Sequence, residues 1–157
     1  MTDTILDIQG LGVVYGSRRH GFRALSDISI DVGRGECVGV VGESGSGKST
    51  LGKAILGLAP VSEGAIRFDG QDITHLKPRE RRKLASRIQV VFQDPYGSLD
   101  PMMNVGDILS EPLSVAGVSS VEAGRRVAEV LDRVRLPSSA ADRYPSEFSG
   151  GQRQRIA

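Results

Sequence analysis

The segment from Gly42 to Ser49 constrains this chain more than any other part of its sequence. It satisfies the pattern G-x-x-x-x-G-K-[ST]. A short apolar run, 37–41, precedes it and is typical of a strand buried on both faces of a parallel sheet. In the following segment, 48–58, apolar residues recur at helical spacing. The order strand, loop, helix is the setting in which this pattern forms a phosphate-binding loop.

The loop's chemistry follows from its residue types. Its glycines permit backbone dihedrals that turn successive N–H groups inward to form a concave anion site, and the helix that follows adds its positive end. Lys48 can reach the β and γ phosphates of a nucleotide, and the Ser49 hydroxyl can bind magnesium. The loop alone does not define the reaction, because kinases, GTPases and transport ATPases all use it. The predicted nucleotide-binding residues here are Gly42, Glu43, Ser44, Gly45, Ser46, Gly47, Lys48, Ser49 and Thr50.

Charge and composition restrict the possible partners and the cellular compartment. The 20 basic and 19 acidic side chains nearly cancel, which argues against nucleic acid as a partner. A single cysteine, Cys37, and an acidic N-terminus without an apolar stretch favour a cytoplasmic protein. No apolar run approaches the roughly 20 residues that span a bilayer, so we expect membrane contact only through another protein.

The chain changes character at about Pro95. Segments 5–15 and 24–32 predict a small antiparallel sheet, 65–68 with the Asp69-Gly70 turn predicts a hairpin, and 87–92 predicts a further strand. The charged residues from 77 to 83 are interpreted as a solvated helix face within 78–86, and Cys37 as a small core residue. Further along, Asn104 can cap a helix to about 110, and Ser119 with Glu122 predicts a capping box for a helix to about 136. Its apolar face should carry the valines and leucines at 121, 127, 130, 131 and 134.

Two later segments resemble one family. Phe148-Ser149-Gly150-Gly151-Gln152, followed by Arg-Gln-Arg, resembles the signature motif of ABC ATPases, and Gln93, at the end of a predicted strand, resembles that family's Q-loop glutamine. The stretch 91–101, VFQDPYGSLDP, and the stretch 144–147, YPSE, are similar to the oligopeptide and dipeptide import branch. Met102, where that branch often has arginine, and Phe148, where leucine is more common, depart from its pattern.

The resemblance implies an α/β fold of the P-loop NTPase class, with a RecA-like core, an antiparallel β subdomain and a helical subdomain. On this basis 1–157 is a partial ATP-binding domain, in which 1–94 form the β subdomain with the phosphate-loop part of the core and 95–157 the helical subdomain. The implied function is that of an ATP-binding subunit on the inner face of the cell membrane. It powers import of a peptide- or nickel-type solute through membrane permease subunits, and indirectly serves a solute-binding protein.

The resemblance also implies roles for individual residues. Tyr15 stacks on adenine, and Gln93 contacts magnesium and the attacking water. Ser149, Gly150, Gly151 and Gln152 close over the ATP of a second ATP-binding subunit in a head-to-tail dimer. Simpler interpretations stay open: an ordinary strand aromatic for Tyr15, a polar strand terminus for Gln93, and an ordinary helix cap for the signature.

The family's catalytic carboxylates and switch histidine follow its signature motif, and 157 residues stop short of them. We therefore expect an N-terminal fragment that binds ATP and Mg²⁺ without hydrolysing ATP. A stand-alone nucleotide-binding module is one alternative. An SMC-type DNA-repair ATPase is another, but such proteins place a long coiled coil where this chain has prolines at 95, 101, 112 and 137.

Overall fold

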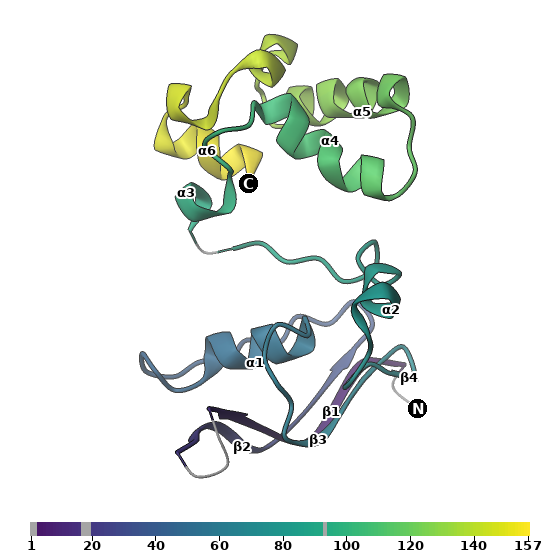
Figure 1. Ribbon diagram of the computed structural model, residues 1–157, viewed down its shortest axis with the longest axis vertical. Helices are drawn as coiled ribbons and strands as arrows, with labels where there is room; N and C mark the ends of the chain where they lie inside the picture. Colours follow the sequence, from purple (N-terminus) through teal and green to yellow (C-terminus); the bar gives the residue numbers. More distant parts are fainter. Residues whose placement is uncertain (1–2, 17–19, 93) are drawn as a thin grey trace. The chain divides into compact units, whose positions relative to one another are not determined.

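The computed structural model describes residues 3–16, 20–92 and 94–157, which form two compact units, Met1–Gln89 and Val90–Ala157 (Figure 1). Within this described part, no helix combines the length and apolar character needed to cross a membrane.

The first unit is built on a four-stranded antiparallel sheet of order β2-β1-β3-β4. Its strands are β1 Thr4–Tyr15, β2 Phe22–Gly33, β3 Glu63–Phe68 and β4 Gln71–Asp72. The predicted strand pair and the hairpin at the Asp69-Gly70 turn are both confirmed.

The helix α1, Lys48–Ile55, lies across one face of this sheet (Figure 1). Leu51 and Ala54 form its buried side, as the helical spacing of apolar residues predicted. They join a core cluster made mostly of side chains from β1, β2 and β3, among them Val13, Leu25 and Ile66. This packing holds the loop that precedes α1 against the sheet. The short α2, Pro78–Arg82, completes the regular structure of the unit.

The strands predicted at 37–41 and 87–92 are not formed, and this part of the sequence prediction is wrong. Val41 is 96% exposed and Val91 84% exposed, and Cys37 is also exposed instead of belonging to the core. A strand buried on both faces of a parallel sheet needs hydrogen-bonded neighbours. Among the described strands, none pairs with either segment, since the sheet comprises only β1 to β4.

The second unit is helical. Its elements are α3 Pro95–Ser98, α4 Val105–Val115, α5 Ser120–Arg133, η1 Ser138–Asp142, η2 Pro145–Glu147 and α6 Gly150–Ile156. The caps predicted at Asn104 and Ser119 are confirmed, because each side chain accepts a hydrogen bond from the backbone N–H three residues later.

Two details of α5 differ from the prediction. The Glu122 carboxylate pairs with Arg125 and Arg126 instead of closing a capping box on Ser119. The buried face is formed by Ala123, Val127 and Leu131, at spacings of four residues, while Val121 is 84% exposed and Val130 is 44% exposed. The prediction selected valines and leucines by residue type. Ala123, which is at four-residue spacing with Val127 and Leu131, faces the core, whereas Val121 and Val130 do not.

Candidate functional site

The loop before α1 ends in a left-handed glycine. Gly47 has φ +96° and is the N-cap of α1, without a side-chain hydrogen bond to the helix. The first helical bond runs from the Leu51 N–H to the Gly47 carbonyl, at 2.9 Å. The N–H groups of the preceding first turn therefore have no intrahelical acceptor, and no acidic side chain lies in that turn. This is the arrangement that favours an anion at a helix start.

Close packing against β2 requires glycine at this position. A Cβ on Gly47 would lie 2.7 Å from Leu25 Cδ2 and 2.9 Å from the Ala24 carbonyl oxygen. Together with the positive φ, this excludes other residues without displacement of the loop. The N-terminal end of α1 is thereby placed beside the first half of β2.

Lys48 folds back over the start of the loop. Its Nζ donates hydrogen bonds to the carbonyl oxygens of Gly42, at 2.7 Å, and Glu43, at 2.6 Å, with Ser46 Oγ at 3.4 Å. The Ser46 N–H in turn donates to the Glu43 carbonyl at 3.2 Å. These contacts hold the ammonium group at the loop, where its charge would lie next to a bound phosphate.

The donor set of the loop fits a magnesium nucleotide. Backbone N–H groups and an ammonium suit phosphate oxygens, and a hydroxyl such as that of the exposed Ser49 suits a magnesium ion that phosphate already holds. Thr50 follows it in the same turn and is half-buried. Gln93, the other expected magnesium contact, lies outside the described residues.

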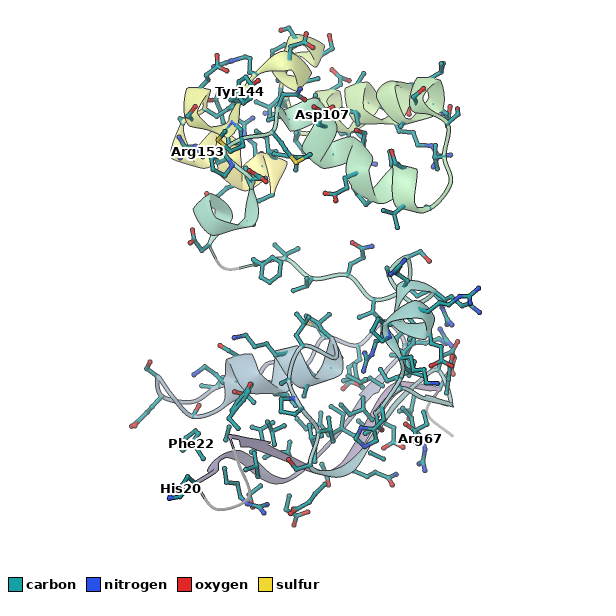
Figure 2. All side chains as sticks on the ribbon, viewed as in Figure 1. His20, Phe22, Arg67, Asp107, Tyr144 and Arg153 are labelled. Atoms are coloured by element: carbon teal, nitrogen blue, oxygen red, sulfur yellow. The ribbon has the colours of Figure 1, made fainter. Side chains whose placement is uncertain are left out.

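Tyr15 lies at the hairpin end of the same sheet. It is half-buried and packs against the core cluster of the first unit. Its cross-strand partner is Phe22, which is 68% exposed (Figure 2). The neighbouring Arg23 makes a bidentate ion pair with Glu63, at 2.9 and 2.8 Å, and its hydrogen bonds lower the pKa of that carboxyl group. Arg23 is thus paired with Glu63. Tyr15 and Phe22 form the last cross-strand pair of the β1–β2 ladder.

The signature residues form the start of α6 in the second unit. Ser149 is the exposed N-cap: its N–H donates to Gln152 Oε1 at 2.9 Å, and the Gln152 N–H donates to Ser149 Oγ at 3.4 Å. Gly151 is exposed, and a Cβ there would meet nothing within 4 Å. The helix cap that sequence reasoning left open as the simpler interpretation is therefore present, with Gly150 as its first helical residue.

The segment ahead of the signature is held from both sides. Arg143 stacks over the buried Phe148 ring, 4.4 Å from its centroid. Arg153, labelled with Tyr144 in Figure 2, donates from Nε to the Pro145 carbonyl at 2.7 Å. Phenylalanine at 148, where leucine is more common, is thus buried with its ring beneath the Arg143 guanidinium.

One residue that contacts α1, Arg81, was not identified from the sequence. Arg81 belongs to the charge run that was interpreted as solvated, but it is half-buried and donates to the carbonyl oxygens of Ile55 and Ile73, both at 2.6 Å. Its position three residues before Leu84 and seven before Ile88 is that of an inward-facing residue, and this spacing could have identified it.

Among solved structures, the chain is similar to the ATP-binding cassette MJ0796, solved as a dimer in a post-hydrolysis state with ADP and Pi. The TM-score is 0.80 with 28% sequence identity, over 96% of this chain and 66% of that one. It is also similar to cbiO1 from Clostridium perfringens, part of the ABC transporter complex cbiONQ, with a TM-score of 0.77 and 30% identity over 98% of this chain and 59% of that one. The expected ABC ATPase type of α/β fold is confirmed by these neighbours.

Curated relatives agree. The chain is 46% identical, over 99% of its length and 50% of the relative's, to an ATP-binding protein of Brucella ovis whose name assigns it to peptide import. It is 49% identical to another such protein from Brucella abortus, over 85% of this chain and 41% of that one. It therefore spans about half the length of the curated relatives it matches. A family model described as ABC transporter matches residues 25–157, and the chain belongs to this family.

Proposed function

We propose that this chain is the nucleotide-binding part of an ATP-binding subunit that powers solute import, with peptides as the favoured cargo class. The observation that carries the proposal is the loop at 42–49, which leads into the uncapped first turn of α1 and is bridged at its start by the Lys48 ammonium. The peptide-import names of relatives at 46% and 49% identity support the cargo class.

The proposal assigns one task to each part of the site. The loop residues and Thr50 bind the phosphates, Ser49 and Gln93 bind the magnesium ion, and Tyr15 stacks on the base. Ser149, Gly150, Gly151 and Gln152 contact the nucleotide of a second ATP-binding subunit. The dimeric state of the MJ0796 cassette supports this arrangement.

Hydrolysis belongs to the proposed function of the whole protein. The 157 residues contain no pair of successive carboxylates after an apolar strand, so we propose that they supply nucleotide binding alone. Permease subunits, with a solute-binding protein acting through them, complete the proposed importer at the inner face of the membrane.

Uptake in cells tests the proposal. A strain whose gene carries Lys48→Ala should fail to take up a labelled short peptide, because the ammonium group at the loop is lost. Lys53→Ala is the matched control, since Lys53 is an exposed lysine on the same helix. Peptide uptake that is unchanged in the Lys48→Ala strain would contradict the importer assignment.

A further inference from the structure

Phe22 is the most exposed aromatic side chain for which the structure gives an exposed fraction, at 68%. It begins β2, directly opposite Tyr15 in the antiparallel ladder. Side chains directly opposite each other in such a pair project from the same face, with Cβ atoms about 5 Å apart. Two aromatic side chains therefore neighbour each other at this end of the sheet.

The face on which they lie is the one that contacts the phosphate-binding loop. Val13 and Leu25 form a buried cross-strand pair, and Leu25 is the side chain against which Gly47 packs. Tyr15 is two residues beyond Val13 on β1, so it projects from the same face. On β2 the same interval takes three residues, from Leu25 to Phe22, because the register shifts between Val13 and Val14, and this shift is what brings Phe22 opposite Tyr15. The pair between them in the ladder, Val14 with Arg23, projects from the other face.

The distance between the loop at 42–49 and the Tyr15–Phe22 pair suits a single ligand that contacts both. Two residues along a strand cover about 7 Å, so the Tyr15–Phe22 pair lies one same-face step beyond the pair that touches the loop. A nucleotide whose phosphates occupy the loop would direct its base toward the two rings. Arg23, the nearest cation on β2, is on the opposite face and is paired with Glu63.

We propose that Phe22 is a second base-contacting residue, which with Tyr15 forms an aromatic site for the purine of the bound nucleotide. The inference rests on the proposed function, since it requires phosphates in the loop. An aromatic contact of this kind is tolerant of base identity, so ATP and GTP should both use it. It also explains why a large apolar side chain is left exposed at the first position of β2.

The chain contains no tryptophan, which makes a direct test possible. In the Phe22→Trp variant the single indole should be quenched by Mg-ATP, with a midpoint equal to the dissociation constant from calorimetry. Inorganic triphosphate, which lacks a base, should bind without quenching. Val121→Trp, at an 84% exposed position on α5, is the control and should not respond to either ligand.

A second variant measures the contribution to affinity. Phe22→Ala should weaken ATP binding about tenfold and leave triphosphate binding unchanged. Equal weakening of both ligands would indicate a structural role and overturn the inference. So would an indole at position 22 whose emission is unchanged when calorimetry shows saturation with Mg-ATP. If the parent chain itself binds no Mg-ATP, the proposed function fails and this inference fails with it.

Discussion

The Arg81 guanidinium donates a 2.6 Å hydrogen bond to the carbonyl oxygen of Ile55, the last residue of α1. A second bond of 2.6 Å to the Ile73 carbonyl ties the same group to the end of the β3–β4 hairpin. A cation at the C-terminus of a helix is favoured by the helix dipole and by the unpaired carbonyls there. Burial nevertheless lowers the pKa of Arg81. One side chain thus binds the C-terminal end of α1, the helix that follows the loop at 42–49.

Arg81→Met should lower the free energy of unfolding by about 1–3 kcal/mol, because two part-buried carbonyl groups lose their donor. Arg79→Met, an exposed arginine on the same helix, should change it by no more than about 0.5 kcal/mol. Urea denaturation followed by circular dichroism measures both. Equal effects of the two substitutions would mean that the Arg81 contacts contribute nothing to stability.

Gly57 gives a way to isolate the same contact. Its φ is +73°, and a Cβ would lie 2.7 Å from Arg81 Nε. Gly57→Ala should therefore destabilise more than Gly70→Ala, because Gly70 has a similar φ, +77°, with nothing within 4 Å. In the Arg81→Met background the two costs should become alike, which a double-mutant cycle checks. A Gly57→Ala cost that does not depend on residue 81 would contradict the contact.

Glu122 predicts a pH dependence for the helical unit. Hydrogen bonds from Arg125, then Arg126, lower the pKa of its carboxyl group from 4.5 to about 2. Because the pKa is lower in the folded state, the ionised carboxylate contributes stability above about pH 4.5, and this contribution is lost as the pH falls toward 2. Glu122→Gln should consequently be less stable than the parent at pH 6, with a difference that shrinks between pH 4.5 and pH 2.

Thermal melts at each pH would measure that difference. Glu111→Gln is the control, since Glu111 is an exposed glutamate on α4 that forms no ion pair with the described residues. A gap between Glu122→Gln and the parent that is constant over this pH range would show that the arginine contacts do not stabilise the folded state.

Tyr15→Ala should reduce affinity for ATP and GTP alike, by about 1–2 kcal/mol, because stacking on an aromatic ring tolerates either purine. Competition with a fluorescent nucleotide measures both affinities. A loss confined to ATP would point to hydrogen-bond recognition of adenine instead of stacking.

The sequence predicted the helix caps and the turn, which depend on residues close together in the chain. Asn104 and Ser119 cap the helices they were expected to cap, and the Asp69-Gly70 turn joins β3 to β4, because caps and turns depend on residues within a few positions. The loop at 42–49 was likewise located by its own residue types.

Features that depend on distant partners were not predictable in this way. The run 37–41 has the composition of a buried strand, yet Val41 is 96% exposed because the described strands provide it with no neighbour. Arg81 was hidden in a charge run, since only the fold brings Ile55 and Ile73 to it. The side of β2 on which Phe22 lies depends on the strand register, which the sequence alone did not specify.

The nucleotide site is tested most directly by calorimetric titration of the chain with Mg-ATP, beside the Lys48→Ala and Lys53→Ala variants. Loss of a charge-assisted contact to phosphate should weaken binding by about 10- to 100-fold in Lys48→Ala, while Lys53→Ala should bind like the parent. Binding of Mg-ATP that is equally tight in all three proteins would contradict the assignment of the loop at 42–49 as the nucleotide site.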